Sequence, residues 1–146
     1  MKLIPIQKEF EENREFAIDP LLKDSLSLTV EFFKRIGYVP PWIGYYAQEN
    51  DQVVGSAAFK GQPVDGKVEI AYGTMEPFRN QGIGAQLCKA LVDLSVQTDP
   101  CIRITARTLP ENDFSTRILR KNNFVFVGMI NDPKDGNVWE WEYKHH

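Results

Sequence analysis

Hydrophobic and polar positions repeat with two different periods along this chain, and the changes of period predict its elements. Alternation or short apolar runs typical of strands occur at 3–6, 42–48, 53–59, 64–75, 101–107, 124–130 and 138–143. Spacings of three and four residues, typical of amphipathic helices, occur at 21–36, 81–97 and 111–123. We expect the first helical region to be split into two helices and to end with Gly37 as a C-cap.

The predicted order of elements is β-α-α-β-β-β-α-β-α-β-β. Turn residues at 49–52 and at Asp135-Gly136 indicate antiparallel hairpins, whereas the strand–helix–strand crossover at 67–107 indicates a parallel pair. The pattern therefore predicts an α/β fold with a mixed sheet and helices on both faces, in a single domain spanning 1–146. The short helix at 111–123 is expected to bury Phe114, Ile118 and Leu119.

Charge and composition exclude some classes of partner. Of the 146 residues, 42% are hydrophobic and 25% charged, and the formal net charge is -3. Lys and Arg are spread along the chain, so we expect no nucleic-acid partner. No apolar run approaches ~18 residues, so we expect no membrane span and a cytoplasmic location. Cys88 and Cys101 fit no metal-binding pattern, and we expect two buried thiols and no metal.

Residues 78–91, FRNQGIGAQLCKAL, place two glycines where an amphipathic helix begins. Glycine costs roughly 1 kcal/mol relative to alanine inside a helix, so Gly82 and Gly84 need a reason. Phosphate binding is one, because the first turn of a helix carries unpaired N–H groups and glycine lets an anion approach them. Arg79 would add positive charge at the rim. Close packing of the helix on a strand is the second explanation, and the two glycines by themselves are consistent with either one.

The surroundings of the glycines carry a family resemblance. Arg79-x-x-Gly82-x-Gly84 follows a strand, opens a helix and resembles the acetyl-CoA-binding motif (Gln/Arg)-x-x-Gly-x-(Gly/Ala) of the GCN5-related N-acetyltransferase (GNAT) superfamily. Residues 104–128, ITARTLPENDFSTRILRKNNFVFVG, resemble the second motif of that family, and the order of elements is also similar. The similarity covers roughly residues 40–143.

The resemblance implies a fold and a binding mode. The sheet would splay between the strands at 67–75 and 101–107, and acetyl-CoA would lie in the slot like an extra strand. Its pantetheine arm would pair with the backbone near Tyr72 to Met75, and Gly73 would form a β-bulge or serve packing alone. Asn112 would contact the same arm, act as a helix N-cap, or do both. The positions expected to bind acetyl-CoA are Thr74, Met75, Arg79, Asn80, Gln81, Gly82, Ile83, Gly84, Ala85, Asn112 and Ser115.

The resemblance also implies direct attack of a primary amine on the thioester. Glu69 matches the glutamate that acts as base in several members of the family, and Tyr72 is a lesser candidate. On a strand Glu69 faces away from Val68 and Ile70, toward either the slot or solvent. A backbone N–H around Thr74-Met75 would hold the oxyanion.

Two positions depart from the family pattern. Leu119 stands where a tyrosine often protonates the leaving thiolate, and Asn123 stands where a glycine is usual. Together, Leu119 and Ser115 resemble the branch that acetylates ribosomal-protein N-termini and some small amines. The departure leaves the general acid unassigned, so a non-catalytic module that binds CoA or an acyl-CoA is the alternative function. A third alternative is an α/β domain that binds a nucleotide or a protein partner and in which the glycines are purely structural.

The expected partners are acetyl-CoA and an amine acceptor. The acceptor pocket is expected to be built from the N-terminal helices, the loop 37–46 and the final hairpin. Tyr38, Trp42, Tyr45 and Tyr46 would line this pocket or pack in the core. The exposed edge of the C-terminal hairpin makes a homodimer a possible assembly.

Overall fold

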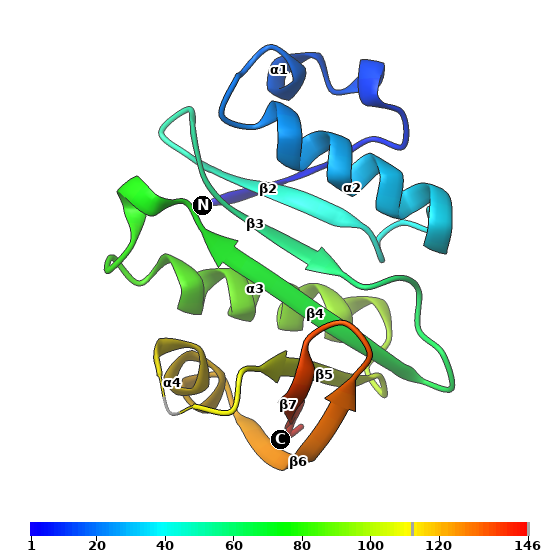
Figure 1. The fold of residues 1–146 in the computed structure, drawn as a ribbon, viewed down its shortest axis with the longest axis vertical. Helices are drawn as coiled ribbons and strands as arrows, with labels where there is room; N and C mark the ends of the chain where they lie inside the picture. Colours follow the sequence, from blue (N-terminus) through cyan, green and yellow to red (C-terminus); the bar gives the residue numbers. More distant parts are fainter. Residues whose placement is uncertain (112, 146) are drawn as a thin grey trace.

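A strongly curved sheet of seven strands organises the structure, a computed structural model that describes residues 1–111 and 113–145 (Figure 1). The strand order is β1-β2-β3-β4-β5-β7-β6. The elements in chain order are β1 (Lys2–Pro5), the 3-10 helix η1 (Phe10–Glu12), α1 (Arg14–Ala17), α2 (Lys23–Ile36), β2 (Gly44–Glu49), β3 (Gln52–Phe59), β4 (Lys67–Thr74), the 3-10 helix η2 (Glu76–Phe78), α3 (Ile83–Thr98), β5 (Arg103–Thr108), α4 (Phe114–Lys121), β6 (Phe124–Asp132) and β7 (Gly136–Tyr143).

The mixed sheet and the order of its elements confirm the predicted fold class. The pairs β1–β2, β2–β3, β3–β4, β5–β7 and β6–β7 are antiparallel, and β4–β5 is parallel. The turn between β2 and β3 places Asn50 and Asp51 at φ of 52° and 62°. Asn and Asp tolerate this left-handed conformation better than other residues with a side chain, which explains the tight hairpin.

The parallel pair β4–β5 separates before β4 ends. Its register runs from Lys67 opposite Arg103 to Ile70 opposite Ala106, although β4 continues to Thr74. Figure 1 shows β4 (green) and β5 (olive) converging on the right and diverging on the left. The predicted splay is therefore present, and it begins directly after Ile70.

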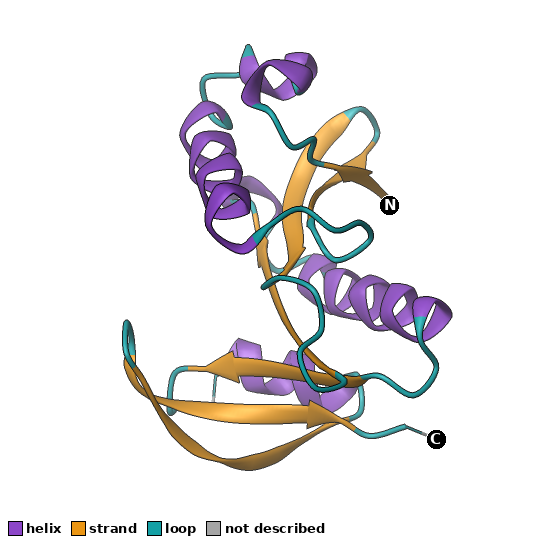
Figure 2. Ribbon diagram, turned by 90° about the vertical axis from the view of Figure 1, so that its right-hand side faces the viewer, coloured by secondary structure: helices purple, strands orange, loops and turns teal. Residues whose placement is uncertain are grey.

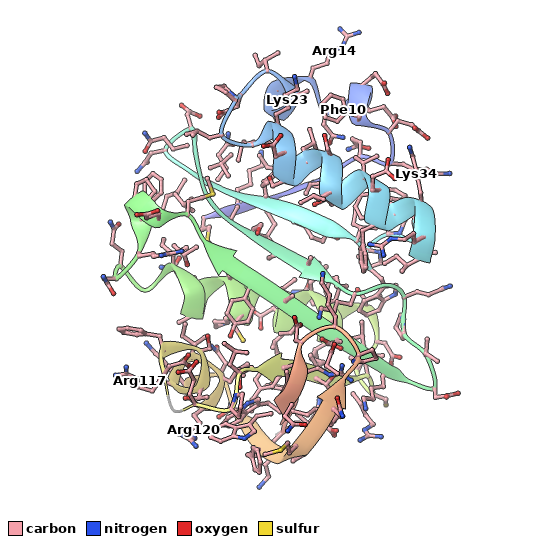
Figure 3. The ribbon with its side chains drawn as sticks, in the orientation of Figure 1. Phe10, Arg14, Lys23, Lys34, Arg117 and Arg120 are labelled. Atoms are coloured by element: carbon pink, nitrogen blue, oxygen red, sulfur yellow. The ribbon has the colours of Figure 1, made fainter. Side chains whose placement is uncertain are left out.

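Helices cover both faces of the sheet, as Figure 2 shows with α2 on one side and α3 on the other. Helix α3 packs on β3 and β4 and buries Leu87, Cys88 and Leu91 completely. Helix α2 buries Leu26, Val30 and Phe33. Charged side chains of α2 and α4, including Lys34 and Arg117, project outward from the opposite faces of these helices (Figure 3).

The structure corrects four local predictions. The segment 21–36 contains one helix, α2, and the preceding helix α1 lies earlier, at Arg14–Ala17. Phe114 is 67% exposed beneath the Arg117 guanidinium, and Cys101 is also exposed, whereas Cys88 is buried. Gly73 forms no bulge, because it pairs in regular register with Ser56 of β3. Gly37 ends α2 with φ of 93°, as predicted.

Two glycines on adjacent strands offer a test of packing against β4. A Cβ at Gly55 would lie 2.6 Å from the Gly73 carbonyl oxygen and 3.0 Å from Leu87 Cδ1, so Gly55→Ala must displace backbone. We expect a loss of about 1–3 kcal/mol in the free energy of unfolding, measured by urea denaturation. Gly73→Ala is the control, because nothing lies within 4 Å of a Cβ there. Equal stability of the two variants would contradict this account of the β3–β4 contact.

Candidate functional site

A small cavity lies where β4 and β5 separate. Its volume is about 120 Å³, and its walls include Glu69 and Tyr72 of β4, Arg107 of β5, and Ser115 and Leu119 of α4. Three predicted site residues, Glu69, Tyr72 and Ser115, are thus brought together from distant parts of the chain. Leu119, which replaces the tyrosine usual in the family, is 1% exposed and forms an apolar wall.

The Glu69 carboxylate lies between two cationic side chains. Lys60 Nζ is 2.9 Å from Oε2, and Arg107 Nε is 3.7 Å from Oε1. The contact with Lys60 lacks the angle of a hydrogen bond, and neither Glu69 Oε2 nor Arg107 Nε has a hydrogen-bond partner among the described residues. Arg107 is held from its other end by Asp132, whose Oδ2 accepts a hydrogen bond of 2.7 Å from Nη1. The Glu69 carboxylate is therefore held by ion pairs at the wall of the cavity.

Along β4, the backbone N–H and C=O groups of successive residues point alternately toward β3 and toward the splay between β4 and β5. Met75 N–H donates to Val54 O at 2.8 Å, and Lys60 N–H donates to Glu69 O at 2.9 Å, so odd-numbered positions bond to the β3 side. The backbone groups of the even-numbered residues point toward β5, and their pairing with β5 ends at Ile70. Within the described residues, the N–H and C=O groups of Tyr72 and Thr74 consequently have no strand to bond.

This register refines the predicted oxyanion site. Met75 cannot supply its N–H, because that group already bonds to Val54, and the Met75 carbonyl accepts a hydrogen bond from Phe78. Tyr72 and Thr74 retain donors that face the splay. Sequence reasoning could not show that the Met75 N–H is already bonded, because the alternation depends on the pairing with β3.

The Tyr72 side chain lies on the α3 side of the sheet, opposite Glu69. Burial raises the pKa of the Tyr72 phenol well above its usual range, and the adjacent Cys88 thiol raises it further. Burial also raises the pKa of Cys88 to about 12, although its hydrogen bond with Tyr72 acts in the opposite direction. Tyr72 is therefore a neutral phenol near pH 7, which makes it unsuitable as a base and leaves Glu69 as the better candidate.

The two glycines before and inside α3 have different physical reasons. Gly82 is the N-cap residue with φ of 77°, a conformation that L side chains rarely adopt, and open space surrounds its Cβ position. Gly84 has an ordinary φ, but a Cβ there would lie 2.8 Å from Ile118 Cδ1 of α4. Gly84 therefore permits close packing of α3 on α4, and Asn122 reinforces the contact through a 3.3 Å hydrogen bond to Ala85 O.

The first turn of α3 is open to an anion. No side chain caps it, and the N–H groups of Ile83, Gly84 and Ala85 have no hydrogen-bond acceptor among the described residues. The preceding residues Arg79, Asn80 and Gln81 are exposed, and Asn80 has φ of 65°. Asn112, the predicted contact to the pantetheine arm, lies outside the described residues, and the N-cap of α4 is Asp113, which accepts from Ser115 N–H and Thr116 N–H.

The predicted aromatic acceptor pocket is not formed. Tyr45 and Tyr46 are buried, and their hydroxyls bond to Pro41 O and Ser25 Oγ. Tyr38 donates to Ile6 O, and Trp42 packs edge-on against Phe59. These four aromatic side chains pack within the fold, because each hydroxyl group or ring contacts another residue in the N-terminal half of the chain.

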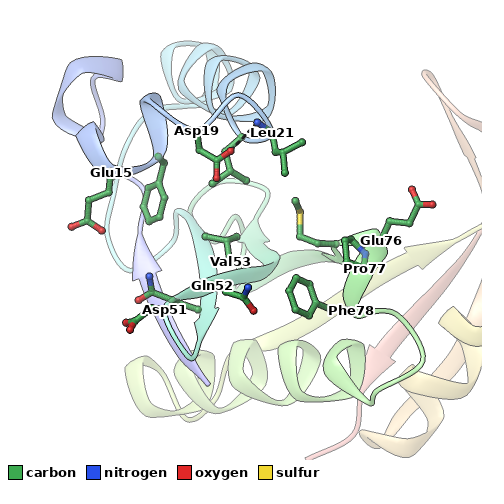
Figure 4. Close-up of a pocket in the computed structure, with 13 residues that line it drawn as sticks. Glu15, Asp19, Leu21, Asp51, Gln52, Val53, Glu76, Pro77 and Phe78 are labelled. Carbon is green, nitrogen blue, oxygen red and sulfur yellow. Dashed lines mark hydrogen bonds between the residues drawn. The ribbon is translucent and has the colours of Figure 1, made fainter.

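A larger cavity lies elsewhere, at the C-terminal end of β4. It encloses about 1100 Å³ between α1, the α1–α2 connection, the β2–β3 turn and η2, and Figure 4 shows its lining. Four carboxylates and several apolar side chains surround it. Sequence reasoning did not predict this cavity, because its walls, which include the β2–β3 turn and η2, meet only when the sheet curves.

Comparison with known proteins identifies the family. The Acetyltransferase (GNAT) family matches residues 7–124, and the chain therefore belongs to it. A curated relative, an uncharacterized N-acetyltransferase YjdG from Bacillus subtilis (strain 168), is 28% identical over 97 residues, which are 66% of this chain. The matched region spans 55% of the length of that relative.

Solved structures share the fold at low sequence identity. A chimera of the spermidine N-acetyltransferase SpeG from Vibrio cholerae and hSSAT has a TM-score of 0.70 at 11% identity, covering 98% of this chain and 95% of its own. RimL, a ribosomal L7/L12 alpha-N-protein acetyltransferase in complex with coenzyme A, has a TM-score of 0.69 at 17% identity, covering 96% and 91%. The aminoglycoside acetyltransferase AAC(6')-Ib in complex with coenzyme A has a TM-score of 0.65 at 19% identity. The match covers 97% of this chain and 91% of that chain.

Neither a metal-binding cluster nor a membrane-spanning helix is found in the described residues. Across residues 1–111 and 113–145, no group of three or more His, Cys, Asp or Glu side chains is arranged to hold a metal ion. In the same residues, no helix combines the length and the apolar character needed to cross a bilayer.

A double-mutant cycle tests the different roles of the glycines. Gly84→Ala should lower the free energy of unfolding by about 1 kcal/mol, because overpacking against Ile118 outweighs the gain in helix propensity. Ile118→Val removes Cδ1 and should relieve this cost, which urea denaturation of the single and double variants would measure. Gly82→Ala is the matched control, since its cost of about 1–2 kcal/mol comes from the left-handed backbone and Ile118→Val should not relieve it. Strict additivity at Gly84 would contradict the packing role.

Proposed function

We propose that this chain transfers the acetyl group of acetyl-CoA to a primary amine by direct attack in a ternary complex. The observation that carries the proposal is the alignment of two sets of unpaired backbone groups. The N–H and C=O groups of Tyr72 and Thr74 line the splay, and the open first turn of α3 follows a few residues later. An acyl-CoA has matching chemistry, with amides in its pantetheine arm and a pyrophosphate beyond them.

The proposed binding mode uses each set for one part of the ligand. The pantetheine amides add to the exposed edge of β4 as a short strand, at Tyr72 and Thr74. The pyrophosphate accepts hydrogen bonds from the N–H groups of Ile83, Gly84 and Ala85, where the helix dipole favours negative charge. Arg79 supplies positive charge at the exposed rim. Asn80, Gln81 and Gly82 shape the loop, and Asn112 and Ser115 remain proposed contacts.

The proposed reaction needs a neutral amine, a polarised carbonyl and a protonated leaving group. The amine nitrogen attacks the thioester carbon, the C–S bond breaks, and the amine loses one proton while the CoA sulfur gains one. The free N–H of Tyr72 or Thr74 stabilises the developing oxyanion. Glu69 removes the proton from the amine, directly or through one water in the cavity. Ser115 is a hydroxyl that lines the same cavity, and it or a water is placed to protonate the thiolate.

A binding module without turnover is the second candidate, because Leu119 gives the cavity an apolar wall where the family often has a tyrosine. The structural neighbours are named as acetyltransferases of different acceptors, namely spermidine, a ribosomal protein and aminoglycosides, so the fold alone does not select one. The proposed location remains cytoplasmic, where acetyl-CoA is available.

Isothermal titration with CoA and acetyl-CoA tests binding, and thiol release over a panel of amines tests turnover. We expect binding of both nucleotides and release with some amines. Gly82→Val should weaken CoA binding at least about tenfold, because a branched side chain both strains the loop and blocks approach to the N–H groups. Binding without release by any amine would favour the silent module. Absence of CoA binding would indicate that Gly82 and Gly84 have only structural roles.

Replacement of Glu69 tests the proposed base. Glu69→Gln keeps the size of the side chain, so we expect unchanged CoA affinity, a fall in kcat of about 10²-fold and a changed pH–rate profile. Glu142→Gln is the matched control, because Glu142 is also a strand glutamate paired with an arginine, Arg103, at 2.7 Å, but it does not line the cavity. An unchanged pH–rate profile in Glu69→Gln would exclude Glu69 as the base.

A further inference from the structure

Four charged side chains from different parts of the sheet form a row of contacts at the cavity that Glu69 lines. Glu69 is on β4, Arg107 on β5 and Asp132 at the end of β6, and Lys60 lies in the connection between β3 and β4. Arg107 Nη1 donates a hydrogen bond of 2.7 Å to Asp132 Oδ2, whereas its Nε is 3.7 Å from Glu69 Oε1. The guanidinium is therefore hydrogen-bonded to Asp132 and only ion-paired with Glu69.

The turn between β6 and β7 fixes the Asp132 carboxylate. Its Oδ1 accepts hydrogen bonds from Lys134 N–H at 2.8 Å and Asp135 N–H at 3.1 Å, which leaves Oδ2 for Arg107. These two backbone hydrogen bonds lower the pKa of Asp132, and Arg107 lowers it further. The Asp132 side chain is only 14% exposed, so its attraction to Arg107 is weakly screened by solvent. Asp132 is thus an ionised acceptor that is held in one orientation.

Arg107 has two carboxylates within salt-bridge distance among the described residues, those of Asp132 and Glu69. Glu140 lies opposite Arg107 in the pairing of β5 with β7, but its salt bridge is with Lys67, at 3.6 Å. A guanidinium can bond one carboxylate through two N–H groups, and Arg107 Nε has no hydrogen-bond partner in the described part of the chain. Loss of the Asp132 carboxylate would therefore leave Glu69 as the acceptor for the whole guanidinium.

A two-point bond from Arg107 would impair Glu69 as a base. A carboxylate that accepts hydrogen bonds from a cation is stabilised in its ionised form, so it takes a proton from an amine less readily. Lys60 already approaches Oε2 at 2.9 Å, which leaves Oε1 as the oxygen that an amine can reach. The 3.7 Å between Oε1 and Arg107 Nε exceeds the roughly 2.7–3.2 Å of an N–H···O bond, so Oε1 is not occupied by Arg107.

We propose that Asp132 is a positioning residue, which holds the Arg107 guanidinium away from Glu69 so that Glu69 Oε1 can accept the proton of the acceptor amine. This inference rests on the proposed function, in which Glu69 is the base. Asp132 and Arg107 make and break no covalent bond and take no proton, which passes from the amine nitrogen to Glu69 directly or through one water. Without the Asp132 carboxylate, the guanidinium closes on Glu69 and competes with the amine.

Proton–nitrogen NMR of the arginine Nε–H groups tests this arrangement without turnover. Arg103 is the internal reference, because its Nε donates to Glu142 at 3.2 Å, and a hydrogen bond to a carboxylate moves the proton signal downfield. We expect the Arg107 Nε–H signal of the wild type upfield of the Arg103 signal. In Asp132→Asn it should move downfield, and Glu69→Gln should abolish that movement. A wild-type Arg107 signal as far downfield as that of Arg103, or one that Asp132→Asn leaves in place, would overturn the inference.

Turnover provides the second test, with the amine of the panel that releases thiol fastest. Asp132→Asn keeps an oxygen for the β6–β7 turn and removes the acceptor of Arg107. We expect kcat to fall about tenfold, with a smaller change in KM for the amine and unchanged CoA affinity. In a Glu69→Gln background the same substitution should lower kcat by less than about twofold, because Asp132 acts through Glu69. An equal fall in both backgrounds would indicate a merely structural role and would overturn the inference.

Glu142→Gln is the matched control, because it removes the partner of another β5 arginine, Arg103, at the same distance of 2.7 Å. We expect kcat within about twofold of the wild type, and a fall as large as that of Asp132→Asn would overturn the inference. Thiol release by the wild type with kcat unchanged in Asp132→Asn would overturn this inference and leave the acetyltransferase. No release by the wild type with any amine would overturn the proposed function, and this inference with it.

Discussion

Parallel hydrogen bonding between β4 and β5 ends at the pair Ile70–Ala106, and most of the candidate site depends on that end point. A strand with one unpaired edge is normally a liability, because its N–H and C=O groups recruit other strands. Here the unpaired stretch is short and is enclosed by α3, α4 and β3, so a second protein strand has little access. The proposed binding of pantetheine amides at Tyr72 and Thr74 uses this unpaired edge.

The opening of the slot imposes close packing on its walls. With β5 turning away, α4 packs beside α3, and it approaches so closely that a Cβ at Gly84 would lie 2.8 Å from Ile118 Cδ1. Asn122 then links the end of α4 to the first turn of α3. The same first turn stays uncapped and faces solvent. Packing and anion binding are therefore not competing explanations for the two glycines, since Gly84 serves the helix contact and Gly82 serves the loop.

Charge is distributed unevenly over the face of β4. At one end, Glu69 is neutralised by Lys60 and Arg107, and Arg107 is fixed by Asp132. At the other end, Glu15, Asp19, Asp51 and Glu76 form no salt bridge with another described side chain. The two ends of this face therefore differ in how their carboxylates are held.

The sequence by itself determined the element order, the hairpins, the crossover and the loop that opens α3, because local periodicity and turn residues encode them. It also placed Glu69 on a strand face opposite Val68 and Ile70. Tertiary structure alone decided which N–H groups remain unpaired, because that depends on the register of β4 against β3. It decided that Tyr45 and Tyr46 are core residues and that Phe114 and Cys101 are exposed, because alternation does not reveal what packs opposite. It also decided the acidic cavity, since Asp19, Asp51 and Glu76 are distant in sequence and meet only where the curved sheet brings three connections together.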